Sequence, residues 1–231
     1  MQDRTFDRLR KPDLRSLNFL IRDEPMPRGT TTPYYRPRSY SWWLNPEIRL
    51  DQGQEGACVG HGWAHELAAR PVQVPMVSQD AFDIYHAAQL VDEWEGEDYG
   101  GTSVNAGAKV ARALGFITGW RWCLDINDVV KSLGYFGPIV MGVDWYEGMW
   151  DVDASGFVRP TGHIVGGHCV ALTQIRVVLG DGQVDPLRSY VTGINSWGRS
   201  WGRDGFFKIA LIDLAVLMSG GDFCVPMGRT L

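Results

Sequence analysis

Residues 194–209 read I-N-S-W-G-R-S-W-G-R-D-G-F-F-K-I. Asn195 stands near the start of this stretch, and Trp197 and Trp201 each stand directly before a glycine. Taken alone, the pattern fits a turn that places two tryptophans in a core. It also fits a site in which Asn195 orients a neighbouring imidazole while Trp197 shields their hydrogen bond from water. Residues 205–210, G-F-F-K-I-A, predict a strand directly afterwards.

The chain before this stretch is rich in strand patterns. Residues 138–143, 167–178 and 187–195 are β-like runs, and G-D-G-Q at 180–183 predicts a hairpin turn between the last two. If those two strands pair, Asn195 comes near His168, which begins the earlier strand. A histidine held at a strand start is a good candidate for a base. His163, in a glycine-flanked loop, is the alternative.

A candidate nucleophile lies far upstream, in residues 52–62, which read Q-G-Q-E-G-A-C-V-G-H-G. We expect a helix from Cys58 to residue 69, ended by Pro71. Unpaired N–H groups at a helix start favour a thiolate, so the pattern predicts a lowered thiol pKa for Cys58. Gly60 and Gly62 each cost about 1 kcal/mol inside a helix relative to alanine, which indicates a site or tight packing.

Two other interpretations of Cys58 remain open at this point. Free cysteines are commonly buried in protein interiors, so Cys58 could be one more core residue. Cys58, His61 and His65 also share one helical face and are of metal-ligand type. A fourth ligand is not evident, and zinc sites usually show a second ligand pair, so we expect no metal.

The remaining patterns divide the chain into a helical first half and a strand-rich second half. Residues 1–41 are polar and rich in proline and arginine, and prolines at 25, 27, 33 and 37 exclude a helix there. We expect an extended arm that wraps the domain. Its expected apolar anchors are Leu17, Phe19, Leu20 and Ile21.

Three further helices are expected in the first half. One begins with Ser78 as its N-cap, one runs over 103–114 and ends at Gly115, and a short one follows Asp125. Helices followed by strands are typical of an α+β protein, here with two lobes.

Composition excludes several function classes. The net charge is -5 and the isoelectric point is near 5.5, which argues against nucleic-acid binding. No apolar run is long enough for a membrane span, and the first residues carry no secretory signal pattern. Four widely spaced cysteines are typical of reduced thiols, so we expect a cytoplasmic location. The cysteines are Cys58, Cys123, Cys169 and Cys224.

Three blocks of the sequence together resemble the papain family of cysteine peptidases. They are Q-G-Q-E-G-A-C at 52–58, G-G-H-C-V-A-L-T at 166–173, and the stretch 194–209. The resemblance covers about 42–226 and is closest in style to bacterial and phage-encoded members. It implies an arm over 1–41, a helical lobe over about 42–135 and a β-barrel-like lobe over about 136–231. The active site would lie in the cleft between the lobes.

The resemblance also implies roles for individual residues. Cys58 would be the nucleophile, His168 the base and acid, and Asn195 the residue that orients His168. Gln52 would join the Cys58 backbone N–H in stabilising the oxyanion. The resting pair would be thiolate and imidazolium, and the reaction would pass through a thioester. No cofactor is implied.

Substrate contacts follow from the same resemblance. Gly100 and Gly101 match the glycine pair that binds the substrate backbone, Trp197 matches an aromatic shield, and Gly167 replaces the acid or amide before the histidine. The acidic run 92–98, D-E-W-E-G-E-D, is expected to be a solvated loop without metal. The implied activity is a peptidase acting on a peptide or protein. The alternative is a catalytically idle papain-like module with a binding or virion-structural role.

Overall fold

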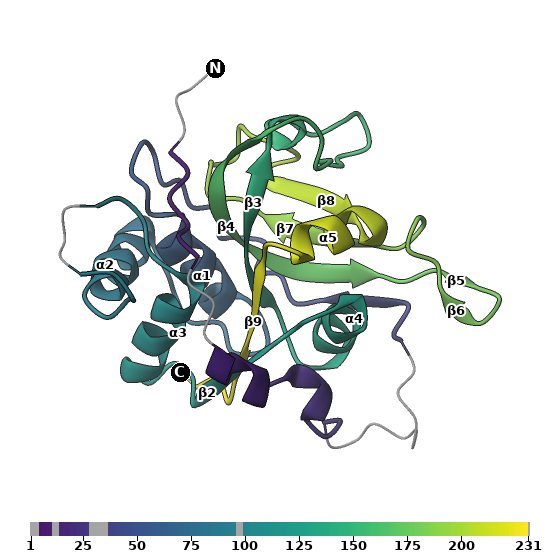
Figure 1. The fold of residues 1–231 in the computed structure, drawn as a ribbon, viewed down its shortest axis with the longest axis horizontal. Helices are drawn as coiled ribbons and strands as arrows, with labels where there is room; N and C mark the ends of the chain where they lie inside the picture. Colours follow the sequence, from purple (N-terminus) through teal and green to yellow (C-terminus); the bar gives the residue numbers. More distant parts are fainter. Residues whose placement is uncertain (1–4, 11–13, 28–36, 96–98, 231) are drawn as a thin grey trace.

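Three of the helices lie on one side of the molecule, and the main sheet, with two further helices packed against it, lies on the other (Figure 1). This computed structural model describes residues 5–10, 14–27, 37–95 and 99–230. The helices α1 (Cys58–Ala68), α2 (Ser78–Gln89) and α3 (Val104–Ala113) pack together on one side, and an antiparallel seven-stranded sheet forms the other. No helix in the described ranges is long and apolar enough to cross a membrane.

The sheet determines where the polar stretch around Asn195 lies. Along the sheet the strands are β2 (Gly119–Trp122), β9 (Asp222–Met227), β3 (Ile139–Tyr146), β4 (Ile164–Arg176), β7 (Tyr190–Ile194) and β8 (Phe206–Ala210), while β1 (Tyr40–Trp42) also pairs with β4. Strands β4 and β7 are antiparallel, as predicted, with Ala171 opposite Ile194. Asn195, directly after β7, is thereby brought next to His168. His168 lies within β4 and not at its start as predicted, because the strand already begins at Ile164.

The predicted turn at 180–183 closes a small two-stranded ribbon. Strands β5 (Leu179–Gly180) and β6 (Gln183–Val184) flank it, apart from the main sheet. Asp181 and Gly182 both have positive φ, 50° and 79°. Two successive positive φ values are the conformation of a type I′ hairpin turn, for which Asp-Gly is a preferred pair.

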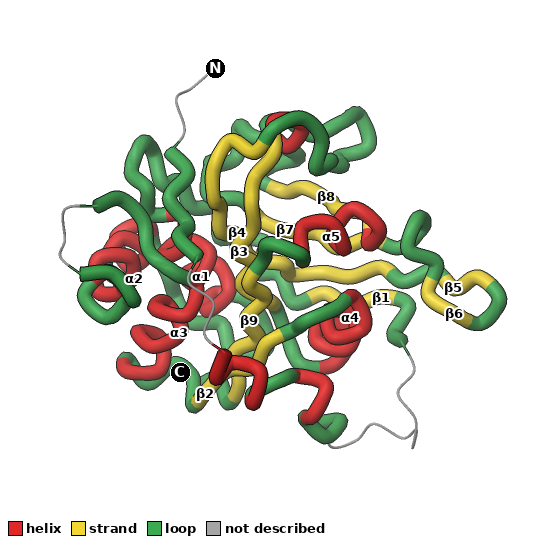
Figure 2. The backbone as a smooth tube through the Cα atoms, in the orientation of Figure 1, coloured by secondary structure: helices red, strands yellow, loops and turns green. Residues whose placement is uncertain are grey.

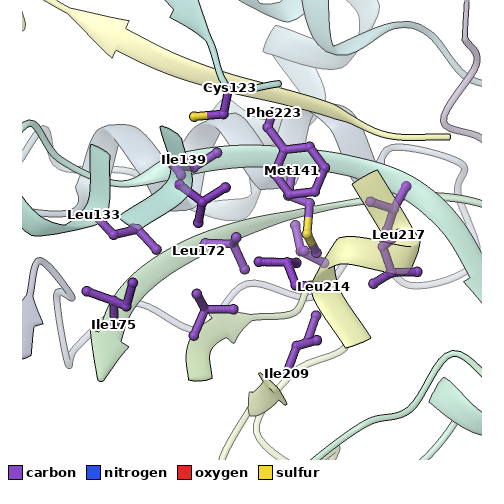
Figure 3. Packing of buried hydrophobic residues seen from close by; sticks show 14 of the residues in the cluster. Cys123, Leu133, Ile139, Met141, Leu172, Ile175, Ile209, Leu214, Leu217 and Phe223 are labelled. Carbon is purple, nitrogen blue, oxygen red and sulfur yellow. The ribbon is translucent and has the colours of Figure 1, made fainter. Parts of the chain in front are cut away.

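Alternation along the central strands builds two cores. Ile139 and Met141 of β3 face one core, whereas Val140 between them faces the other. The first core lies under α4 (Ile126–Tyr135) and α5 (Leu211–Met218), and Figure 3 shows Leu133 and Leu214 reaching it from these helices. The second core joins the sheet to α1, α2 and α3.

The helical first half and the strand-rich second half of the chain are less separate in the structure than the sequence patterns indicate. Helix α4 precedes residue 136 but packs against the sheet, apart from α1, α2 and α3 (Figure 2). Strand β2 also comes from the first half and pairs with β9 near the end of the chain.

Most of the expected helix ends are confirmed. Ser103 accepts a hydrogen bond from the Ala106 N–H at 3.0 Å, and Gly115 follows α3 with a φ of 81°. Asp125 caps α4 by accepting from the Asp128 N–H at 3.1 Å. The prediction that Ser78 caps α2 is wrong, because Ser78 is already helical and the Asp80 carboxylate instead accepts from the Val77 N–H at 2.7 Å.

The arm is held by fewer apolar anchors than predicted. Two short 3₁₀ turns, Leu14–Asn18 and Ile21–Asp23, run along the domain. Ile21 is fully buried and Leu20 packs against the helical core, but Leu17 and Phe19 are 53% and 52% exposed and are not anchors. Residues 1–4, 11–13 and 28–36 of the predicted arm, Pro33 among them, lie outside the described residues.

Candidate active site

Cys58 is the first residue of α1 and is fully buried. The glycines that follow it serve close packing. A Cβ on Gly60 would collide with the α2 backbone at Ala81, and a Cβ on Gly62 would lie 2.8 Å from the Cys169 Sγ on β4. Helix α1 therefore lies tightly against both α2 and β4, and its start is fixed next to the His168–Cys169 segment.

His168 is held in one orientation by Asn195. The His168 Nε2 lies 2.8 Å from the Asn195 Oδ1, and that oxygen also accepts from the Ser196 N–H at 2.8 Å. Because Oδ1 is an acceptor in both contacts, Nε2 carries the proton and Nδ1 is the nitrogen that can take one up. Trp197 stacks on the buried ring, with centroids 4.9 Å apart and planes inclined by 29°.

The other candidate histidine lies apart from this group. His163 is exposed and its Nδ1 lies 3.1 Å from Glu147 Oε2. His86, on α2, is also exposed, with its Nε2 3.2 Å from Glu55 Oε1.

Gln52 links the loop before α1 to the residues beside Asn195. Its Oε1 accepts from the Ser196 Oγ at 2.5 Å. Its Nε2 donates to the Glu55 carbonyl oxygen at 2.9 Å and to the Thr5 carbonyl oxygen at 3.3 Å. Gln52 is 1% exposed, so its amide is positioned by these contacts.

Thr5 belongs to a segment that the sequence patterns did not single out. Residues 5–9, here called the covering segment, run between β4 and the start of α3 (Figure 1). The Arg8 N–H donates to the Gly167 carbonyl oxygen at 2.8 Å, the Thr102 N–H to the Asp7 oxygen at 3.1 Å, and the Leu9 N–H to the Thr102 oxygen at 2.9 Å. An extended peptide thus lies over the predicted site.

The predicted substrate glycines line this segment. A Cβ on Gly101 would strike the Asp7 carbonyl oxygen, and one on Gly167 would strike the Arg8 carbonyl oxygen. A Cβ on Gly100 would lie 3.4 Å from the Asp7 carboxyl group. The backbone hydrogen bonds come from Thr102 and Gly167, whereas the Gly101 N–H donates to the Tyr85 hydroxyl at 3.0 Å.

Phe6 covers the histidine side of the site. Its ring centroid lies 5.5 Å from that of His168, 5.7 Å from that of Trp197 and 4.8 Å from that of Trp150. These edge-to-face contacts place an apolar side chain directly beside the predicted base.

Relatives detected by sequence are cysteine peptidases. The chain is 35% identical over 85 residues to cathepsin B-like cysteine proteinase 6 of Caenorhabditis elegans, and 33% identical over 85 residues to cathepsin B-like protease 1 of Arabidopsis thaliana. Each match covers 37% of this chain but only 21% of the relative's length. No protein-family model matches the chain.

Solved structures extend the similarity to the whole chain. Xylellain, a cysteine protease from Xylella fastidiosa, aligns with 100% of this chain and 99% of its own, with a TM-score of 0.66 and 17% identity. The chain has the papain-like fold. The bromelain protease from Ananas comosus, solved with the E64 inhibitor, aligns with 83% of this papain-like chain and 100% of its own, with a TM-score of 0.57 and 17% identity. The predicted papain-like α+β fold is confirmed.

The thiol of this papain-like chain does not have the lowered pKa that its helix position predicts. Burial raises the pKa of Cys58 to about 11, and hydrogen bonds from the backbones of Asp7 and Cys169 offset this only in part. The prediction is wrong for this state because burial removes water from the sulfur, and that loss outweighs the helix start. All four cysteines of the chain are free and buried.

The acidic run is wrongly predicted as a plain solvated loop. The Asp92 carboxylate accepts from the Tyr99 and Thr102 hydroxyls, each at 2.7 Å. Glu93 accepts from the Ser103 hydroxyl at 2.8 Å and pairs with Lys109 at 3.0 Å. These acids hold residues 99–103 in place beside the covering segment, while residues 96–98 lie outside the described residues.

The histidines of the alternative metal site on α1 form hydrogen bonds with backbone groups. His61 Nδ1 contacts the Ala57 carbonyl oxygen at 2.9 Å, and His65 Nε2 accepts from the Leu50 N–H at 3.1 Å. Within the part of the chain that the structure describes, no group of three or more histidines, cysteines or acids is arranged to hold a metal ion.

The lowered pKa of the buried His65 predicts that the stability of the protein depends on pH. Burial, with the nearby His61 and Arg49, lowers its pKa from 6.5 to about 3. The unfolded chain therefore binds a proton below pH 6.5 that the native chain does not, and stability is lost as the pH falls. From pH 6.5 to pH 5 His65 alone contributes a loss of about 2 kcal/mol, to be measured by urea unfolding as the difference between the parent and a variant without His65.

The His65→Gln variant should lack this acid-dependent loss. Glu66, whose pKa burial raises to about 7, acts in the opposite sense, so parent and variant are compared at each pH. The exposed His163→Gln is the matched control. Equal slopes for the parent and His65→Gln would show that His65 is protonated in the native state.

Proposed function

We propose that this papain-like chain is a cysteine peptidase with Cys58 as its nucleophile. His168 Nδ1 takes the thiol proton, the sulfur attacks a peptide carbonyl carbon, and the protonated ring then gives that proton to the leaving amine. A water molecule, deprotonated by His168, hydrolyses the resulting thioester. The observation that carries the proposal is the buried His168–Asn195 hydrogen bond under Trp197, on the strand against which the start of α1 packs.

The covering segment supports a peptide as the substrate. Thr102 and Gly167 make three backbone hydrogen bonds with it, and these groups would serve any extended peptide equally. The Thr5 carbonyl oxygen, 3.3 Å from the Gln52 Nε2, lies at the donor that we assign to the oxyanion. For substrate to enter, the covering segment must leave.

Gln52→Ala is expected to lower kcat for peptide hydrolysis by on the order of 10²–10³, because one oxyanion donor is lost. The assay uses a chain carrying Arg8→Ala, which weakens the hold of the covering segment. The exposed neighbour Gln54→Ala is the control. A change in KM with kcat unaltered would contradict the oxyanion role and assign Gln52 to substrate binding alone.

A second candidate function is a catalytically idle binding module. The full burial of Cys58 and its raised pKa favour it. The two candidates predict different results for the Arg8→Ala chain. A peptidase hydrolyses a peptide mixture when the covering segment is weakened, with new termini visible by mass spectrometry, whereas an idle module leaves the mixture intact at every pH.

A further inference from the structure

Arg8 of the covering segment is buried in an acidic site. The residue is 4% exposed. One terminal guanidinium nitrogen, Nη2, donates to the Asp222 Oδ2 at 2.5 Å and to the Gly220 carbonyl oxygen at 3.1 Å. The other, Nη1, lies 3.7 Å from the Asp144 Oδ1. Burial of a charged group is costly unless the charge is paired, and here two carboxylates and a carbonyl provide the partners.

The walls of this site belong to the folded domain. Asp144 is on β3, Asp222 begins β9, and these strands pair with Gly142 opposite Asp222. Gly142 leaves space for the Arg8 side chain, since a Cβ at position 142 would lie 2.8 Å from the Arg8 Nε and 2.6 Å from Val104 of α3. Three elements distant in sequence thus form the site, and the arm supplies only its occupant.

The site is adjacent to the reacting sulfur. Asp7, the residue before Arg8, forms a backbone hydrogen bond with Cys58. The Arg8 N–H donates to Gly167, which directly precedes His168. A peptide bound in place of the covering segment would therefore put a side chain into this site within about one or two residues of the attacked carbonyl.

We propose that the Asp144–Asp222 site is the specificity pocket of this chain and selects substrates with an arginine near the bond to be cleaved. The inference rests on the proposed peptidase function. In the described residues both carboxylates lie beside Arg8. They lose this partner when the covering segment leaves. A substrate guanidinium restores these contacts. Lysine, a point charge without the planar fork, fits less well, and glutamate is repelled.

The test separates binding from hydrolysis. Short peptides that differ at one position, which carries arginine, lysine, glutamine or glutamate in turn, are titrated into the full chain bearing Arg8→Ala and Cys58→Ala. For one position of the peptide, the peptide with arginine there should bind about tenfold or more tightly than the peptide with glutamine there. Asp222→Asn and Asp144→Asn, both isosteric, should each reduce that ratio.

A matched control is Glu24→Gln, which removes a carboxylate from another arginine pair, with Arg121 at 2.5 Å, and should leave the ratio unchanged. Equal binding of arginine and glutamine peptides at every position, or a ratio unaffected by Asp222→Asn, overturns the pocket. The same peptides are then given to the chain that retains Cys58. Arginine-selective binding without hydrolysis supports the pocket and rejects the peptidase, while hydrolysis without arginine preference rejects the pocket and supports the peptidase.

Discussion

Replacement of Cys58 by alanine is expected to abolish peptide hydrolysis. In a chain with Arg8→Ala, kcat should fall by on the order of 10⁵–10⁶, because no thioester can form and the remaining site offers only binding and oxyanion contacts. Hydrolysis of a fluorogenic peptide with and without the substitution measures the fall.

The matched control is Cys123→Ala, another free and buried cysteine, in the sheet core. It costs stability through a small cavity, visible in the melting temperature, but should change kcat by less than about tenfold. Hydrolysis that survives Cys58→Ala would show that a different residue, or a contaminating enzyme, carries the activity.

The second large effect is expected from loosening the covering segment. Phe6→Ala combined with Arg8→Ala removes the ring beside His168 and the charge in the acidic site. Water then reaches the sulfur, and its pKa falls from about 11 to the ordinary 9 or below. Two pKa units multiply the thiolate fraction at pH 7 by about 100, so alkylation of Cys58 by iodoacetamide should accelerate at least about 100-fold.

The control for this pair is Phe19→Ala with Arg10→Ala. These residues have the same chemistry and lie on the same arm, but both are exposed. Alkylation at the parent rate in both double variants would mean that residues 6 and 8 do not keep water from the sulfur.

The central pair of the site could be predicted from local patterns. Two β-like runs joined by a turn at Asp181–Gly182 predict antiparallel strands, and such pairing brings Asn195 to His168. Cys58 at a helix start also followed from glycines and a proline that mark helix boundaries. In each case the information lies within one hairpin or one helix.

The covering segment could not be predicted in this way. Thr5–Leu9 has no helical or strand period, and its partners Thr102, Gly167 and Asp222 lie far along the chain. Arg8 also contradicts the rule that charged residues lie at the surface, because two distant strands provide its carboxylates. The raised pKa of Cys58 comes from its full burial, which a local pattern does not reveal, so the sequence predicted the opposite direction.

The most direct test of the account is the rate of Cys58 alkylation as a function of pH, in the chain with Phe6→Ala and Arg8→Ala. If His168 forms an ion pair with the uncovered sulfur, alkylation should already be rapid at about pH 5. The His168→Ala substitution should abolish this rapid alkylation at low pH. An alkylation rate that follows an ordinary thiol near pKa 9 in both chains would contradict the pairing of Cys58 with His168 and the peptidase function derived from it.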